Sequence, residues 1–205
     1  MNEQSGEHDA FHHAVVSSDF EPLILVDASD REMGFMSKAR CHEGRGVLHR
    51  AFSLFIFNPE GQFLMQQRSA AKRLWPGYWS NSCCSHPRRG ESLQLAAHRR
   101  LWQELGMRCT LLPLFKFRYQ AQFDATGAEN ELCSVYIGCS SGPVRANVHE
   151  IADWCWIEPA QLQSELQRGV RRFTPWFKIE WKRIWTQLSS ALPRAQHASE
   201  AWVYR

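Results

Sequence analysis

One segment limits the possible folds more than any other: a predicted amphipathic helix over Glu91–Leu105. Apolar side chains recur along it at helical spacings, at Leu95, Leu101, Trp102 and Leu105. Gly106 follows as a natural C-terminal stop. Predicted strands precede and follow it at Glu21–Asp27, Leu48–Phe57, Gln62–Arg68, Cys109–Gln122 and Leu132–Cys139. Two further helices are predicted at Pro159–Gln167 and Pro175–Leu188. Strands mixed with a few helices predict an α/β or α+β domain.

The length of the chain fits one domain. Its 205 residues are enough for a hydrophobic core and too few for two ordinary domains. Hydrophobic residues make up 44% and charged residues 22%, a mix that excludes a disordered or fibrous chain. We expect a folded domain over residues 21–190, a flexible N-terminal tail over residues 1–20 and a C-terminal tail over residues 191–205.

Charge and cysteine usage narrow the class of partner. The net charge of +3 is too small to indicate nucleic acid, but it fits one basic pocket for an anionic ligand. No apolar run is long enough for a membrane span, and the polar start at Met1–Ala10 is unlike a secretion signal. Seven cysteines without such a signal predict reduced thiols and a cytoplasmic protein.

The helix and the turns around it carry the first functional motif. Residues Gly90–Gly106 resemble the Nudix box, the loop–helix–loop that holds a divalent metal against a diphosphate. Nudix hydrolases place Arg-Glu and Glu-Glu along this helix, whereas this chain has Arg99-Arg100 and Gln103-Glu104. A hydrolytic site with several metals needs several carboxylates. Because Glu104 is the one carboxylate at these four positions, hydrolysis is less well supported.

The second motif is a set of histidines and glutamates. His42, His49 and His86 are followed by Glu129 and Glu131, two residues apart in an extended stretch, so both carboxylates face the same way. Two like charges side by side are costly unless a cation lies between them. Three imidazoles and two carboxylates suit a five- or six-coordinate ion, more like Mn²⁺ or Mg²⁺ than a closed zinc site, with Zn²⁺ left open.

The third motif, Trp75–Pro87, combines aromatic residues with two adjacent thiols. Cys84 and His86 share a face if this segment is extended, and Cys83 then points to the opposite side. We expect Cys83 to pack as a small hydrophobe and nearby cations to favour the thiolate of Cys84.

Together these stretches closely resemble the type I isopentenyl-diphosphate Delta-isomerases, Nudix-fold enzymes that interconvert isopentenyl and dimethylallyl diphosphate. The matching residues run in family order over nearly the whole predicted domain: Lys38, His42, His49, Arg68, Lys72, Trp75-Pro-Gly, Asn81, Cys84, His86-Pro87, Arg100, Glu104, Tyr119, Glu129, Glu131 and Pro175-Trp176. The resemblance implies a single Nudix domain with a mixed β-sheet between helices.

The resemblance also implies a role for each matching residue. A divalent ion, Mn²⁺ with Zn²⁺ or Mg²⁺ as alternatives, would be held by His42, His49, His86, Glu129 and Glu131. Glu104 and the backbone carbonyl of Cys84 would contact a Mg²⁺ that arrives with the diphosphate. The residues implied to be catalytic are Cys84, Glu131, Tyr119 and Trp176. Those implied to bind the diphosphate are Lys38, Arg68, Lys72 and Arg100.

Two alternatives remain open from the sequence. A Nudix pyrophosphohydrolase shares the fold and the contact between Mg²⁺ and diphosphate, but expects carboxylates where Arg100 and Gln103 stand. A non-catalytic metal-binding module would leave Cys84, Tyr119 and Trp176 unexplained. The expected partner is a small isoprenyl diphosphate, with no nucleic acid and no membrane span, and we expect a monomer.

Overall fold

The computed structural model describes residues 14–195, with side chains up to residue 188. The strands are β1 (Pro22–Val26), β2 (Glu32–Ser37), β3 (His49–Phe57), β4 (Phe63–Arg68), β5 (Trp79–Ser80), β6 (Cys83–Ser85), β7 (Leu111–Asp124), β8 (Gly127–Cys139) and β9 (Ile151–Ile157). The helices are α2 (Lys38–Cys41), α3 (Leu93–Leu105), α4 (Pro159–Arg168) and α5 (Pro175–Ala195).

Strand β3 is the centre of the mixed sheet. It pairs in parallel with β8 from His49 opposite Glu131 to Phe57 opposite Cys139. It also pairs antiparallel with β6 and, near its ends, with β1 and β4. The long hairpin of β7 and β8 extends the sheet beyond β8, and β4 carries β5 and β9. Parts of the chain far apart in sequence therefore meet around one strand.

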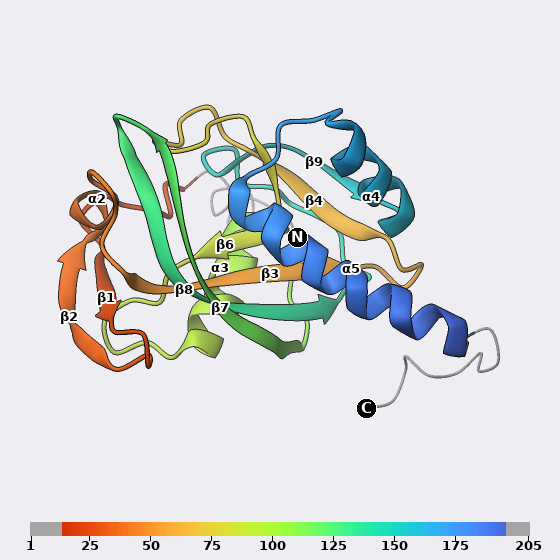
Figure 1. Cartoon of the computed structure of the whole chain (residues 1–205), viewed down its shortest axis with the longest axis horizontal. Coiled ribbons are helices and arrows are strands. Elements are labelled where there is room, and N and C mark those ends of the chain that lie inside the picture. Colours follow the sequence, from red (N-terminus) through yellow and green to blue (C-terminus); the bar gives the residue numbers. More distant parts are fainter. Residues whose placement is uncertain (1–13, 196–205) are drawn as a thin grey trace, which may run out of the picture.

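Helices cover both faces of this sheet (Figure 1). On one face Ala51 and Phe55 of β3 belong to a core that includes Leu162 of α4 and Phe177 and Trp181 of α5. On the other face Phe52, Leu54 and Ile56 pack with apolar residues of α3. Successive side chains of β3 point to opposite faces, and both faces are buried, which explains why its sequence is hydrophobic without alternation. The predicted single domain with a mixed sheet between helices is confirmed.

Local signals explain where α3 begins and ends. The Ser92 side chain accepts a hydrogen bond from the Leu95 backbone N–H, which caps the helix. Gly106 has φ 64°, the left-handed conformation that glycine adopts at low cost after a helix. The predicted helix at Glu91–Leu105 is thus confirmed, although it begins two residues later than predicted, at Leu93.

A close approach at the start of β8 fixes α2 against the sheet. The Ala128 N–H donates to the carbonyl of His42 at 3.0 Å. A Cβ at Gly127 would lie 2.0 Å from that same carbonyl oxygen, so only glycine fits this position. The backbone thereby holds His42 beside the strand that carries Glu129 and Glu131.

Several elements differ from the expectations. The sequence patterns did not predict β2 and β9, and the Trp75–Pro87 segment contains the short strands β5 and β6. The strand predicted at Leu132–Cys139 begins earlier, at Gly127, and α5 continues to Ala195. Of the predicted N-terminal tail, residues 14–20 are described, and some of them form hydrogen bonds with the folded domain. Residues 1–13 lie outside the described part. Of the C-terminal tail, residues 196–205 lie outside it as well.

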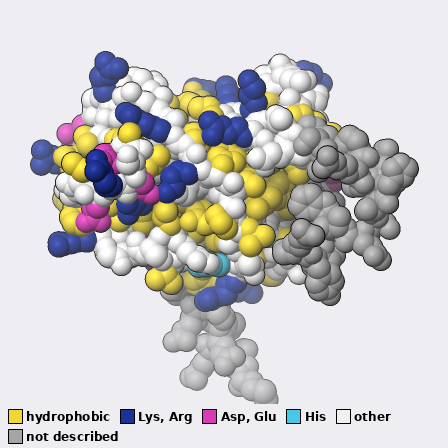
Figure 2. Space-filling model, turned by 60° about the horizontal axis from the view of Figure 1, so that its bottom comes forward, with side chains coloured by type: hydrophobic (Ala, Val, Ile, Leu, Met, Phe, Trp, Pro, Cys, Tyr) yellow, Lys and Arg dark blue, Asp and Glu magenta, His cyan; other side chains and the backbone are white. Residues whose placement is uncertain are grey.

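The surface mixes apolar and basic side chains. Figure 2 shows a broad exposed band of apolar side chains across one face, with Lys and Arg scattered around it. Within the described part of the chain, no helix combines the length and the hydropathy that crossing a membrane requires.

One buried carboxyl stands out in the core beneath α5. Glu180 is 0% exposed, and its Oε1 lies 3.6 Å from the Cys133 thiol, whereas its Oε2 has no hydrogen-bond partner in the described structure. Burial raises the pKa of Glu180 to about 8, and hydrogen bonds with Ser53 and Cys133 and the charge of Arg183 offset burial only in part. The nearby carboxylate of Glu131 acts in the same direction as burial.

This shift predicts a pH-dependent stability. Between its ordinary pKa of 4.5 and its raised value of about 8, Glu180 keeps a proton in the folded chain that the unfolded chain releases. The contribution of Glu180 to the free energy of unfolding is thus fully present below pH 4.5 and is lost as pH rises toward 8. We expect Glu180→Gln to gain stability relative to wild type across this range, by at most about 1.4 kcal/mol per pH unit.

Urea unfolding of both proteins at a series of pH values measures the difference. Glu60→Gln, in the exposed turn between β3 and β4, is the control for loss of one carboxyl group. A stability difference between Glu180→Gln and wild type that stays constant with pH would contradict the prediction.

Candidate active site

A cavity of about 340 Å³ gathers most of the predicted site residues. Eleven of them line it: Lys38, His42, Arg68, Lys72, Cys84, His86, Arg100, Tyr119, Glu129, Glu131 and Trp176. The two others, His49 and Glu104, are buried and interact with lining residues. The fold therefore brings together residues that span more than half of the sequence.

The three histidines and two glutamates form one compact cluster. Their five ligand atoms all lie within 4.8 Å of one another. His49 and Glu131 are direct neighbours in the parallel register of β3 and β8, and Glu129 lies on the same face of β8 two residues earlier. His42 follows α2, and His86 follows β6.

Backbone contacts orient two of the imidazole rings. Nδ1 of His42 lies 2.7 Å from the Lys38 carbonyl, and Nδ1 of His49 lies 2.7 Å from the Val47 carbonyl. Each Nδ1 must carry the proton to donate to its carbonyl, which aims the Nε2 lone pair of a neutral ring at the carboxylates. Nε2 of His49 is buried, has no hydrogen-bond partner among the described residues and lies 3.7 Å from Glu131 Oε1.

The donor set fits a divalent cation. Nε2 of His86 lies 3.0 Å from Glu131 Oε1, and Nε2 of His42 lies 2.8 Å from Glu129 Oε2. Nitrogen and carboxylate atoms that converge in a buried site, including an unpartnered imidazole nitrogen, are what a metal ion requires. The cluster is therefore a candidate metal centre.

The pKa shifts of His86, Glu129 and Glu131 agree with that role. Burial lowers the pKa of His86 well below its ordinary value, and the neighbouring imidazoles add to the effect. Burial alone would raise the pKa values of Glu129 and Glu131, but nearby imidazoles lower both. Glu129 conversely raises the pKa of His42, although burial opposes it. Ionised carboxylates and a neutral imidazole are the forms that bind metals.

The catalytic residues implied by the resemblance lie beside this cluster. Tyr119 is opposite Glu131 in the pairing of β7 with β8, and its hydroxyl donates to Glu131 Oε2 at 2.7 Å. Burial and the charge of Glu131 raise the pKa of Tyr119 well above its ordinary value, so the phenol stays protonated. Glu131 thus points one oxygen at the histidines and the other at Tyr119.

The two adjacent cysteines point to opposite faces of the sheet, as predicted. Cys83 is fully buried in the core beneath α3, whereas Cys84 lines the cavity. Arg68 and Lys72 do favour the Cys84 thiolate, as predicted, but burial outweighs them. Burial raises the pKa of Cys84 to about 12, and Arg68, whose Nη1 lies 3.9 Å from Sγ, offsets only part of this effect.

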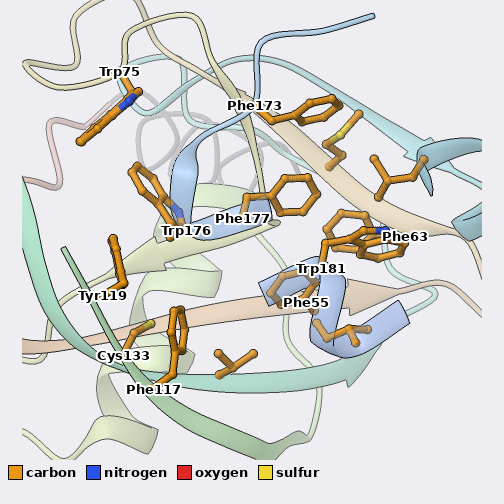
Figure 3. Close-up of a cluster of buried hydrophobic side chains, with 14 of the residues drawn as sticks. Phe55, Phe63, Trp75, Phe117, Tyr119, Cys133, Phe173, Trp176, Phe177 and Trp181 are labelled. Atoms are coloured by element: carbon orange, nitrogen blue, oxygen red, sulfur yellow. The ribbon is translucent and has the colours of Figure 1, made fainter. Parts of the chain in front are cut away.

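Aromatic rings form one wall of the cavity. Trp176 is 2% exposed at the start of α5, and the ring of Trp75 meets it at 90° with centroids 5.3 Å apart. Tyr119 lies on the other side, with its ring centroid 6.0 Å from that of Trp176. Figure 3 shows these three rings at one end of the larger aromatic core.

Arg68, which also lines the cavity, supports this wall. It donates from Nε to the Trp75 carbonyl at 3.1 Å and from Nη2 to the Leu74 carbonyl at 2.8 Å. Its guanidinium lies 5.3 Å from the centroid of Trp176, within range of a cation–π interaction. Trp75 has φ 48°, a conformation that bulky residues rarely adopt, and these two hydrogen bonds help to hold it.

A buried carboxylate that the sequence analysis missed organises the basic side of the cavity. Glu150 forms ion pairs with Lys72 and with Arg100, whose Nη2 lies 3.2 Å from Glu150 Oε2. The charges of Lys72 and Arg100 outweigh burial and lower the pKa of Glu150 to about 2. Arg100 also pairs with Glu104 at 2.6 Å. No spacing in the sequence indicates Glu150, because only the fold brings it to these cations.

The N-terminal segment also reaches the cavity. Arg100 donates to the Val16 carbonyl at 2.6 Å, and Asn147 donates to the Ala14 carbonyl at 2.9 Å. Lys38 is hydrogen-bonded to the Ser17 hydroxyl. Residues that were predicted as a flexible tail therefore contact two of the predicted diphosphate-binding cations.

Comparisons with known proteins agree with this architecture. The family model of the NUDIX domain matches residues 47–177. A crystal structure from Deinococcus radiodurans has a TM-score of 0.65 at 23% identity, covering 80% of this chain and 98% of that one. The MutT protein from Methanosarcina mazei has a TM-score of 0.55 at 20% identity, covering 68% of this chain and 94% of that one. These two structures show the shared fold.

Proteins with similar sequences identify the family more specifically than the solved structures do. The isopentenyl-diphosphate Delta-isomerase of Serratia proteamaculans is 44% identical over 157 residues, which cover 77% of this chain and 87% of the relative. That of Burkholderia multivorans is 41% identical, covering 77% of this chain and 89% of the relative. The chain belongs to the isopentenyl-diphosphate Delta-isomerase family of the Nudix superfamily.

Proposed function

We propose that this chain catalyses the reversible isomerisation of isopentenyl diphosphate to dimethylallyl diphosphate, a step of isoprenoid biosynthesis. The observation that carries the proposal is the arrangement of Cys84, the Tyr119–Glu131 pair and Trp176 around one cavity. Two groups that exchange protons and an aromatic face are what moving a double bond by one carbon requires.

The reaction protonates one alkene carbon and removes a proton from another. An unactivated alkene is a very weak base, so the acid must be held against it in a site closed to water. The tertiary carbocation that forms needs stabilisation without a nucleophile to trap it. The buried indole of Trp176 provides this by cation–π attraction, worth about 2 kcal/mol when desolvated.

Cys84 and Glu131 are the proposed proton donor and acceptor. Both line the cavity, and Tyr119 holds Glu131 through a hydrogen bond from its hydroxyl. One of the two must be protonated and the other ionised when the substrate binds. Because the reaction is reversible, the two roles exchange with its direction.

The anionic diphosphate requires cations in the same cavity. We propose that Lys38, Arg68, Lys72 and Arg100 bind it, since all four line the cavity. Glu104 and the backbone carbonyl of Cys84 would hold the Mg²⁺ that accompanies it. His42, His49, His86, Glu129 and Glu131 would hold Mn²⁺, or Zn²⁺ or Mg²⁺, which would compensate the negative charges of the two carboxylates.

The hydrolase alternative is weaker because of Arg100. This residue stands on α3 where Nudix hydrolases have a carboxylate, and its buried guanidinium pairs with both Glu104 and Glu150. A hydrolase uses several free carboxylates to hold metals and generate hydroxide. We further propose a monomer that acts in the cytoplasm, where the Cys84 thiol stays reduced.

The assay for the function uses purified protein, isopentenyl diphosphate, Mg²⁺ and Mn²⁺. We expect the acid-labile allylic diphosphate to appear without release of phosphate. Release of monophosphate or pyrophosphate instead would favour a hydrolase. Neither product, together with a metal-dependent gain in stability, would favour a non-catalytic metal-binding module.

Metal removal is expected to cost both activity and stability. A metal bound by five groups of the folded chain adds to the free energy of unfolding, so chelator-treated protein should melt at a lower temperature. At low concentration Mn²⁺ or Zn²⁺ should restore the melting temperature more than Mg²⁺, because the ligands include three imidazoles. Differential scanning fluorimetry with metal titration measures this. Metal-free protein with unchanged stability and full activity at the Mg²⁺ level of the substrate would refute the metal site.

The adjacent cysteines offer a matched pair of variants. Cys84→Ala should abolish isomerisation, because the proton-exchanging group at the cavity is lost. Cys84→Ser should be nearly inactive as well, since a hydroxyl is a much weaker acid than a thiol. Cys83→Ala, on the opposite face, should retain activity and lose only modest stability, about 1 kcal/mol from the small cavity left in the core.

Steady-state kinetics with urea unfolding distinguish the two cysteine positions. An epoxide analogue of the substrate should also label Cys84 covalently, as detected by peptide mapping. An inactive Cys83→Ala together with an active Cys84→Ala would reverse the assignment.

A further inference from the structure

Asn81 lies between β5 and β6, is 0% exposed, and contacts two parts of the proposed site. Its Oδ1 accepts a hydrogen bond from the indole Nε1 of Trp176 at 3.2 Å. Its Nδ2 donates to the Cys83 carbonyl at 2.7 Å, and that carbonyl belongs to the peptide bond that leads into Cys84. One side chain therefore joins the aromatic wall to the strand that carries the proposed proton-exchanging thiol.

A chain of buried hydroxyls holds this amide in place. The Ser80 hydroxyl lies 2.9 Å from Asn81 Oδ1 and 2.9 Å from the Thr174 hydroxyl. Ser80 and Thr174 are both 0% exposed, and Thr174 immediately precedes α5. Backbone hydrogen bonds between Trp79 and the segment before α5 reinforce the contact. The start of α5, and with it Trp176, is thus fixed relative to β5 and β6.

The chemistry of the position requires an amide. Oδ1 faces donors on Trp176 and Ser80, whereas Nδ2 faces the carbonyls of Cys83 and Leu54, the latter at 3.4 Å. Aspartate has the same shape but would place a second acceptor against those two carbonyls. An apolar residue would leave the buried indole N–H without its acceptor and would remove one donor from each carbonyl, which is costly in a core.

We propose that Asn81 is a positioning residue for the isomerisation, setting the indole of Trp176 relative to Sγ of Cys84 by holding both through one amide. This inference rests on the proposed function, because Trp176 and Cys84 take their roles from it. The effect is expected in the rate rather than in substrate binding. In the proposed function the diphosphate is anchored by cations, whereas the carbocation depends on the ring and proton transfer on the thiol.

The test compares Asn81→Ala with Ser82→Ala. Ser82 is also 0% exposed and makes two buried hydrogen bonds, to the Leu64 carbonyl and from the Ile56 N–H, but within the described part of the chain its hydroxyl is hydrogen-bonded to neither Trp176 nor Cys84. We expect Asn81→Ala to lower kcat by about ten- to a hundredfold with KM changed by less than about threefold, as small misplacements of reacting groups do. Ser82→Ala should lose stability and keep the wild-type kcat.

A double-mutant cycle distinguishes positioning from a general structural role. Trp176→Phe removes the indole N–H, so Asn81→Ala should lower kcat by a smaller factor in that background than in the wild type. A tertiary-ammonium diphosphate, which mimics the cation, should bind Asn81→Ala more weakly than it binds the wild type. Equal factors in both backgrounds, or a loss of kcat in Ser82→Ala equal to that in Asn81→Ala, would overturn the proposal.

Two further outcomes are decisive. If Asn81→Ala does not fold, Ser80→Ala takes its place: it removes one donor to Oδ1 and should lower kcat less, again by a smaller factor in the Trp176→Phe background. An unchanged kcat in Ser80→Ala would then overturn the proposal. A wild-type protein that does not isomerise isopentenyl diphosphate would refute the proposed function itself, whereas an active wild type with an equally active Asn81→Ala would refute only the positioning role.

Discussion

The parallel pairing of β3 with β8 is the constraint on which the rest of the site depends. Its register sets His49 beside Glu131 and leaves Glu129 on the same face of β8. A shift of one residue would turn both carboxylates to the opposite face of the sheet. The pairing of β7 then places Tyr119 against Glu131, and β6, on the other edge of β3, brings Cys84 to the same cavity. The proposed proton-exchanging pair and the candidate metal centre thus depend on the register of these strands.

The same register places buried charges close together, and the surrounding residues compensate for them. Glu129 and Glu131 would repel each other strongly in a site of low dielectric constant if no positive or polarisable group lay between them. The neighbouring imidazoles lower the pKa of both carboxylates, and a bound cation would complete this compensation. On the other side of the cavity Glu150 compensates Lys72 and Arg100. Breaking either arrangement by removing one partner would leave an unpaired buried charge, which costs far more than loss of an exposed ion pair.

The sequence predicted what depends on local pattern and missed what depends on the environment. The helix ending at Gly106 and the opposite facing of Cys83 and Cys84 follow from 3.6- and two-residue periodicities, and both are confirmed. Most site residues were predicted through the family resemblance, and the cavity does gather them. Glu150 was missed because its partners are distant in sequence. The net shift at Cys84 was missed because the number of nearby cations does not reveal how deeply a thiol is buried. The hydrogen bonds from Arg68 to the carbonyls of Leu74 and Trp75 were likewise not predicted by any motif.

The difference between isomerase and hydrolase on this fold follows from α3 and the opposite wall of the cavity. Arg100 holds the carboxylates of Glu104 and Glu150 in buried ion pairs beside the proposed diphosphate site. That arrangement suits binding of an anion and leaves fewer carboxylates for generating hydroxide. Water near the other end of the cavity would trap a carbocation, and there the wall consists of the buried rings of Trp176 and Tyr119. A site that binds an anion without a set of free carboxylates, next to an aromatic wall, suits moving protons on a hydrocarbon and not the cleavage of a diphosphate bond.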